Sequence, residues 1–195
     1  MKRTVNPFIV TVMLSANILA RSSSVANKPL TIGIADKNGG AMGLTFTPPE
    51  EDGWKITKSG VSVSLKKNGA SADENKEIEA YLMNLDVPIN PISGYVEQIK
   101  KNTLDGYGND SRFKILALEV VPDNAKSQCA RVHLLLEDKK PLRTVSHEHI
   151  KLSEQYVLSC GSLKYKGMGV EVRYYDRYYE PNKDNQLAEK ANKIF

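Results

Sequence analysis

An α+β fold, with an antiparallel β-sheet packed against helices, is predicted by the order of patterns along this sequence. Four β-type stretches follow one another in the second half, joined by turns that contain proline or glycine. Such short connections favour antiparallel pairing. Two stretches with helical features precede these strands, and one at the C-terminus follows them. Helices and strands that are segregated along a chain pack as separate layers around one core.

Composition indicates one ordinary globular domain. The chain has 195 residues, of which 41% are hydrophobic and 26% charged, as is usual for a soluble domain. Its formal net charge is +4, but residues 1–26 hold three cations and no acid, so a chain beginning at Asn27 has 27 − 3 = 24 cations, 23 anions and a net charge of +1. Without a concentrated basic field, we expect neither nucleic acid nor an anionic membrane as the main partner.

The N-terminus has the pattern of a secretory signal peptide. Two cations precede an apolar run from Val5 to Ala20, and small residues follow it. We expect residues 1–26 to be the signal, with cleavage after Ala20 or Ala26. The run is shorter and more polar than the roughly 20 apolar residues that span a bilayer. The sequence therefore predicts a periplasmic or secreted protein without a stable membrane anchor, and a single α+β domain over residues 27–195.

The first elements expected in this domain are strands. Residues 30–34 and 44–47 have β-type composition, and the second stretch ends at a proline pair, which stops a central strand. Trp54 and Ile56 then alternate with polar residues, a Ser-Gly turn follows, and the alternation resumes at Val61. This pattern predicts a β-hairpin with Trp54 in the core.

A helix is expected next, from Ser71 to Leu85. Ser71 and Glu74 have the spacing of a capping box, in which each side chain satisfies a free backbone amide at the helix start. Ile78, Leu82 and Leu85 follow at i, i+4 and i+7, which places them on one helical stripe.

Two further helices complete the predicted layers. The first begins with Ser93 as its cap and runs toward Leu104. The second covers Asp184 to Phe195 and places three apolar side chains on one face, which should pack back onto the sheet: Leu187, Ala191 and Ile194. Between these helices lie the four expected strands, at residues 113–121, 130–136, 155–159 and 167–179.

The only two cysteines, Cys129 and Cys160, lie at the ends of two of these strands. If the two strands pair antiparallel around the loop near Val145, the thiols can face each other and form a disulfide, as is common in exported proteins. Two buried free thiols are an equal alternative. A zinc site built from both cysteines and His133 is a third, but it lacks a convincing fourth ligand and the paired-Cys spacing of structural zinc sites.

The candidate binding residues lie on the last strand, Gly167 to Tyr179. Because side chains alternate along a strand, Val170, Val172 and Tyr174 point to one face and the charged and aromatic residues to the other. The second face predicts a strip that binds another protein by stacking and charge-assisted hydrogen bonds; a solvated face whose rings cover the arginine stems is the alternative. The strip consists of Arg173, Tyr175, Arg177 and Tyr179.

The element order, together with Phe46, Pro48 and Gly53-Trp54, resembles the PsbP-like α/β sandwich proteins, a group that includes DcrB-like periplasmic proteins and small export-associated chaperones. The resemblance covers most of residues 44–195. It implies a non-enzymatic accessory or binding role, with no catalytic residues to carry over.

Catalytic motifs give little support to an enzyme. The sequence has three histidines and no Gly-x-Ser-x-Gly, P-loop, Gly-x-Gly-x-x-Gly or His-Glu-x-x-His pattern. His147 and His149 flank Glu148, and in an extended segment both imidazoles can share a metal ion. We therefore expect an exported binding or accessory protein, of the immunity-factor or chaperone-like kind and without a cofactor. The alternative is a small secreted metal-binding protein or enzyme that uses the loop from His147 to His149.

Overall fold

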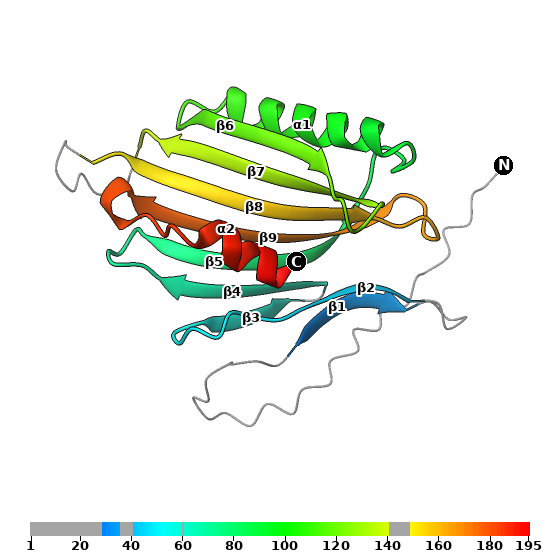
Figure 1. Cartoon of the computed structure of the whole chain (residues 1–195), viewed down its shortest axis with the longest axis horizontal. Coiled ribbons are helices and arrows are strands. Elements are labelled where there is room, and N and C mark those ends of the chain that lie inside the picture. Colours follow the sequence, from blue (N-terminus) through cyan, green and yellow to red (C-terminus); the bar gives the residue numbers. More distant parts are fainter. Residues whose placement is uncertain (1–28, 36–40, 60, 141–148) are drawn as a thin grey trace.

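A computed structural model describes residues 29–35, 41–59, 61–140 and 149–195, and it confirms the α+β class (Figure 1). Seven antiparallel strands form one large sheet in the order β3-β4-β5-β9-β8-β7-β6, and two more form a separate pair, β1-β2. Helix α1 lies beside β6, and the C-terminal helix α2 crosses the sheet near β5 and β9.

The described elements follow the chain in a simple order. The strands are β1 (Leu30–Ala35), β2 (Ala41–Phe46), β3 (Lys55–Ser59), β4 (Ser62–Asn68), β5 (Asn75–Asn84), β6 (Phe113–Pro122), β7 (Cys129–Asp138), β8 (Lys151–Gly161) and β9 (Met168–Tyr179). The helices are α1 (Ile92–Gly108), the short 3-10 helix η1 (Glu180–Asn182) and α2 (Leu187–Ile194).

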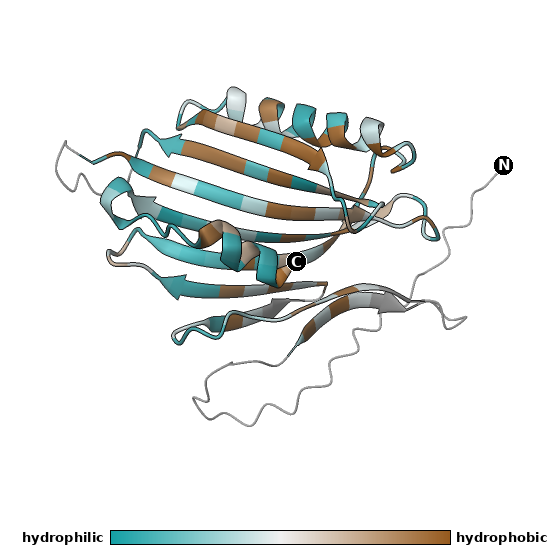
Figure 2. Cartoon of the chain, viewed as in Figure 1, coloured by the Kyte–Doolittle hydropathy of each residue, from teal (hydrophilic) through white to brown (hydrophobic). Residues whose placement is uncertain are grey.

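The two faces of the large sheet are covered at opposite ends. On one face, the β1-β2 pair and α2 pack with Trp54, Leu65, Ile78, Val172 and Tyr174 into the largest core cluster. On the other face, α1 packs over β6 and β7. Figure 2 shows the corresponding pattern, with long hydrophobic stretches on β6 and β7 and long hydrophilic ones on β5 and β9. In the described part of the chain, no helix packs over the β3-β4-β5-β9 half of the face that carries α1.

The helix predicted from Ser71 to Leu85 is wrong, because residues 75–84 form strand β5. Residues four apart share a face in a strand as well as in a helix, so Ile78 and Leu82 fit both periods. The strand is stabilised by its neighbours, since β5 pairs along its whole length with β9 and through most of it with β4. Ser71 and Glu74 do not start a helix: the Glu74 side chain is hydrogen-bonded to Ser71, but it also accepts a hydrogen bond from the backbone amide of Tyr179 at 3.0 Å.

The other local predictions are largely confirmed. Strands β3 and β4 form the expected hairpin, and Trp54 is buried. Helix α1 begins at Ile92, with Pro91 at the cap position and without the side-chain cap expected from Ser93. Helix α2 packs its three expected apolar residues into the core: Leu187, Ala191 and Ile194. Neither α-helix of the described regions has both the length and the apolar character needed to cross a membrane.

Candidate functional site

The half of the sheet over which no described helix packs carries a polar face that includes most of the predicted strip. Successive residues of β9 alternate between faces, and the register aligns those pointing away from α2 with matching residues of β5 and β4. We call this surface the polar sheet face. It consists of Thr57, Ser64, Lys66, Glu77, Glu79, Tyr81, Glu171, Arg173, Tyr175 and Arg177.

Glu77 is the centre of one hydrogen-bonded group on this face. Its side chain is 1% exposed, and its carboxylate accepts hydrogen bonds from Ser64 at 2.7 Å and from the Tyr175 hydroxyl. Lys66 forms an ion pair with it at 3.0 Å. Burial opposes ionisation of Glu77, but these donors outweigh burial and lower its pKa. The Tyr175 ring is therefore held in a fixed position.

A second group fixes Arg173. Its guanidinium donates to Glu171 at 2.8 Å and to the Tyr81 hydroxyl at 3.2 Å, and Tyr81 also donates to Glu171. The Arg173 side chain is only 29% exposed, and its Nε is buried without a hydrogen-bond partner in the structure. Arg173 thus has its charge balanced by Glu171 within the protein.

Arg177 differs from the other charged residues of the face. Its guanidinium lies over the Tyr175 ring, 5.3 Å from the ring centroid, and it forms no ion pair with any residue that the structure describes. Stacking on an aromatic ring leaves the edge of a guanidinium free to donate hydrogen bonds to a carboxylate. Lys55 and Lys66 are exposed on the same side of the sheet. Among these cations, Arg177 is the one that is both oriented and without a carboxylate partner in the described chain.

Glu79 is the remaining acid on the face. Burial, and then the neighbouring Glu77 carboxylate, raise the pKa of Glu79. Glu79 thus lacks the hydrogen-bond donors that lower the pKa of Glu77.

Tyr179, the fourth residue of the predicted strip, is not part of the accessible surface. It is 5% exposed, and its hydroxyl donates to the Asp73 carboxylate at 2.9 Å. Lys151 forms an ion pair with the same carboxylate at 3.0 Å, and the side chains of Lys151 and Asp73 are each 3% exposed. The expectation that Tyr179 is exposed is therefore wrong, because the turn that precedes β5 and the start of β8 bury this end of β9.

Cys129 and Cys160 form a disulfide, and the predicted antiparallel register aligns the two residues. Both sulfurs are bonded to each other, so they are not available as thiolate ligands for zinc. His133 is also engaged elsewhere: its Nε2 lies 2.9 Å from the Glu154 carboxylate, and its ring stacks on Tyr156.

The predicted metal loop lies only partly within the described residues. His147 lies outside the described residues, and His149 is described and exposed. Within the described ranges, no three His, Cys, Asp or Glu side chains are grouped as a metal site requires.

Sequence reasoning missed the residues that organise the polar sheet face. The helix predicted from Ser71 to Leu85 includes Glu77 and Tyr81, whose alternation with Ile78 and Ala80 is the signal for a strand with one polar face. No local signal indicates that Glu77 meets Tyr175, because 98 positions separate them.

Comparison with known proteins does not assign a family. No protein-family model and no curated protein matches the chain. Among solved structures, it is similar to the 1.9 Å crystal structure of the Saccharomyces cerevisiae Ran-binding protein Mog1p, with 11% sequence identity and a TM-score of 0.38 over 86% of this chain and 88% of that chain. A similarity at this level carries no functional conclusion.

Proposed function

We propose that this protein is an exported, non-enzymatic binding or accessory protein whose polar sheet face binds an acidic segment of another protein. The resemblance to PsbP-like and DcrB-like proteins supports an accessory role, of the chaperone-like or immunity-factor kind. The disulfide supports export, because disulfides persist in oxidising compartments.

The orientation of Arg177 is the observation that carries the proposed binding site. The Arg177 guanidinium lies over the Tyr175 ring, and the Tyr175 hydroxyl donates a hydrogen bond to Glu77. A side chain that is already ordered loses less entropy on binding than a free one, which favours affinity. Because the Glu77 and Glu171 carboxylates have cationic partners within the protein, the unpaired charge of Arg177 favours a partner that supplies a carboxylate.

Photocrosslinking in the native compartment tests this proposal. A benzoylphenylalanine placed at Thr57, which is exposed on the polar sheet face, should form a crosslink to one protein partner. The same group at Lys101, on the exposed side of α1, is the matched control and should not form that crosslink. Equal crosslinking from both positions, or none from Thr57, would contradict the proposed face.

The affinity of the crosslinked partner should fall when Arg177 is replaced. Truncating an arginine at the centre of an interface commonly costs about 2 kcal/mol, or close to thirtyfold in Kd. We expect this loss for Arg177→Ala with an unchanged melting temperature, and a smaller loss at high salt. Lys101→Ala serves as the control for removing one exposed cation. An unchanged Kd for Arg177→Ala would remove Arg177 from the site.

Export should be visible in the mass of the recovered protein. Protein purified from the periplasm or medium is expected to lack residues 1–20 or 1–26, because the charged start and the short apolar run suit translocation and cleavage. Intact-mass measurement distinguishes the two cleavage sites. A mass that retains Met1 to Ala20 would contradict the prediction.

A further inference from the structure

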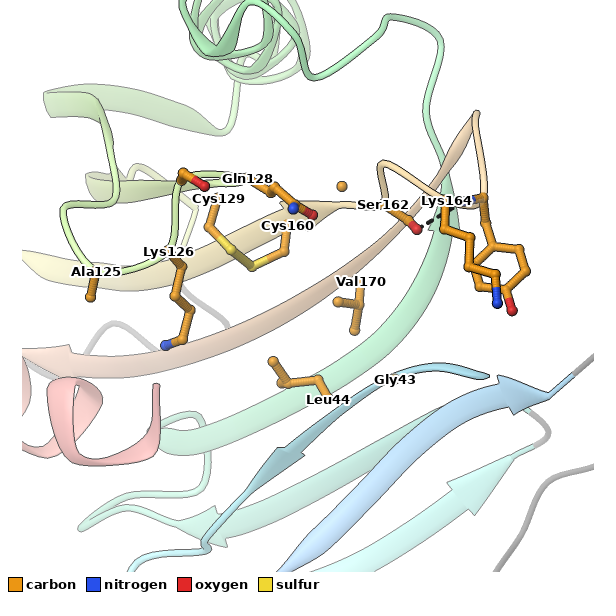
Figure 3. Close-up of a pocket in the computed structure, with 13 residues that line it drawn as sticks. Gly43, Leu44, Ala125, Lys126, Gln128, Cys129, Cys160, Ser162, Lys164 and Val170 are labelled. Carbon is orange, nitrogen blue, oxygen red and sulfur yellow. Dashed lines mark hydrogen bonds between the residues drawn. A yellow bond between two sulfur atoms is a disulfide. The ribbon is translucent and has the colours of Figure 1, made fainter. Parts of the chain in front are cut away.

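A pocket of about 460 Å³ lies beside the disulfide, at one end of the large sheet (Figure 3). Strand β2 lies on one side of it, the loop before β7 and the β8-β9 loop line the rest, and the disulfide faces it. Its wall belongs to the sheet face opposite the polar sheet face, since Val170 alternates with Glu171 along β9. The volume falls within the range of small-molecule sites.

The chemistry of the pocket is apolar at its floor and cationic at its rim. Leu44, Val170 and the Cys129–Cys160 disulfide supply the apolar surface. Lys126 and Lys164 are the only charged residues among the 13 described residues that line it, so this described lining contains no carboxylate. Figure 3 shows the two lysines on opposite sides of the apolar floor. A ligand that fits this arrangement has an apolar body and a negative charge.

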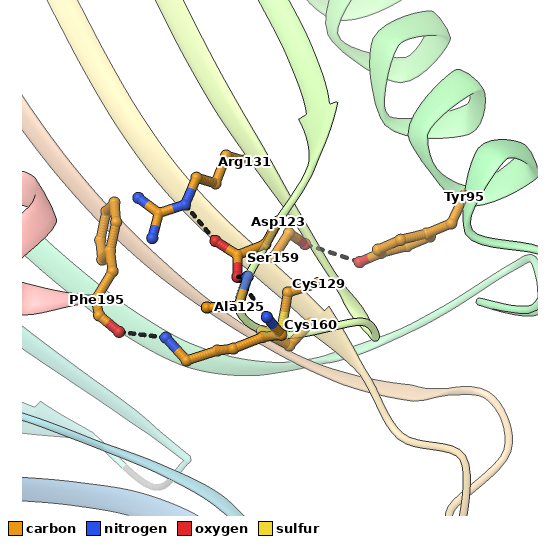
Figure 4. The surroundings of a disulfide bond; sticks show 9 residues. Tyr95, Asp123, Ala125, Cys129, Arg131, Ser159, Cys160 and Phe195 are labelled. Carbon is orange, nitrogen blue, oxygen red and sulfur yellow. Dashed lines mark hydrogen bonds and ion pairs between the residues drawn. A yellow bond between two sulfur atoms is a disulfide. The ribbon is translucent and has the colours of Figure 1, made fainter.

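Hydrogen bonds to Asp123 fix the conformation of the loop that carries Lys126. Asp123 is 5% exposed and accepts hydrogen bonds from the backbone amides of Ala125 at 3.0 Å and Lys126 at 2.6 Å, and from the Arg131 side chain (Figure 4). Burial opposes ionisation of Asp123, but the Arg131 and backbone bonds lower its pKa. Its charge is therefore compensated by Arg131 of β7 and by the loop amides, and it does not oppose an anion in the pocket.

Hydrogen-bond donors accompany the lysines. The Ser162 oxygen accepts the backbone amide of Tyr165 at 2.9 Å, which leaves the hydroxyl hydrogen to donate elsewhere. Lys164 lies 5.1 Å from the centroid of the Tyr165 ring and forms no ion pair within the described residues. Lys126 by contrast donates to the main-chain oxygen of Phe195. Lys164, with Ser162, therefore provides the available anion contact.

We propose that this pocket binds an amphipathic anion, namely a single aliphatic chain with a carboxylate or phosphate head. The aliphatic chain lies over Leu44, Val170 and the disulfide, where it buries apolar surface. The head group binds Lys164 and Ser162. This site is separate from the polar sheet face and does not depend on the function proposed for it.

Calorimetric titration of the full chain with dodecanoate, below its micelle concentration, tests the proposal. We expect saturable binding with one ligand per chain. Dodecyl phosphate has the same chain with a phosphate head, so comparing it with dodecanoate shows which head group the site prefers. Binding of either ligand supports the site. Acetate, which has the head without the chain, and dodecyltrimethylammonium, which has the chain with a cationic head, should both bind at least about tenfold more weakly. Equal binding of dodecyltrimethylammonium, or no binding of either anionic amphiphile, would overturn the proposal.

Two variants locate the ligand. Lys164→Gln should weaken dodecanoate binding by about tenfold, whereas Lys139→Gln, which removes an exposed cation that does not line the pocket, should leave it unchanged. Ser127 lines the pocket and is exposed, so Ser127→Trp should block binding without changing the melting temperature. If Lys164→Gln and Lys139→Gln have equal effects, or if Ser127→Trp folds and binds normally, the ligand lies elsewhere and the proposal is wrong.

Discussion

Replacing Lys151 with methionine should destabilise the fold by about 3 to 5 kcal/mol, because it leaves the Asp73 carboxylate buried without its cation. Both side chains are 3% exposed, and their charged atoms lie 3.0 Å apart. Burial opposes ionisation of Asp73, but hydrogen bonds from Lys151, Ser71 and Tyr179 lower its pKa to about 2. Chemical denaturation at pH 7 measures the loss.

The pH dependence gives this prediction a second, independent readout. Folding lowers the pKa of Asp73 from 3.8 to about 2. This shift contributes about 2 kcal/mol to the free energy of unfolding of the native protein, which is present above pH 4 and is lost as the pH falls toward 2. Glu154 should add a loss of stability over the same pH range. The hydrogen bond from His133 lowers the pKa of Glu154 to about 2; burial opposes this shift, and the hydrogen bond from Tyr178 adds to it. In Lys151→Met, the pKa of the unpaired Asp73 should rise, so mild acid should reduce the difference from the native protein.

Two further variants separate the effect of the buried charge from that of losing any ion pair. The double variant Lys151→Met with Asp73→Asn removes the buried charge and should recover part of the lost stability. Lys193→Met removes a surface ion pair with Glu189 and should leave the denaturation midpoint nearly unchanged. If Lys151→Met is no more destabilising than Lys193→Met, the buried ion pair does not stabilise this end of the sheet.

Replacing Trp54 with alanine should also lower the free energy of unfolding by about 3 to 5 kcal/mol. The side chain is 7% exposed, and the edge of its ring meets the Tyr174 ring at a centroid distance of 6.1 Å. Tyr174 is itself fully buried, so neighbouring groups cannot readily move into the space that truncation leaves. The loss therefore combines removed apolar contact with a cavity in the main core.

Trp54→Phe and an exposed truncation are the matched controls. The phenylalanine keeps an aromatic ring, and the Trp54 Nε1 has no hydrogen-bond partner among the described residues, so this variant should lose less than alanine. Leu104→Ala on α1, where the side chain is 43% exposed, should change stability by less than about 0.5 kcal/mol. A loss below about 1 kcal/mol for Trp54→Ala would place this residue outside the stabilising core.

The limits of sequence reasoning are clearest at β5. Ile78 and Leu82 are spaced by four residues, which suits both a helical stripe and one face of a strand, and Ser71 with Glu74 matched a helix start. Pairing with β4 and β9 makes residues 75–84 a strand, and Glu74 and the neighbouring Asp73 hold the end of β9 through hydrogen bonds from Tyr179. Local propensity could not have revealed these partners.

The sequence by itself determined the α+β class, the β3-β4 hairpin, the four later strands and the apolar face of α2, because each depends on a short-range period or turn signal. It also placed the cysteines at strand ends that pair in the predicted register. Only the tertiary structure decided that Arg173 is paired, that Tyr179 is buried and that Arg177 lies on the Tyr175 ring, on the part of the sheet that no described helix covers. The physical reason is distance along the chain: Glu77 and Tyr175, or Asp73 and Tyr179, are about one hundred residues apart, and their contacts arise from strand order, which no local pattern encodes.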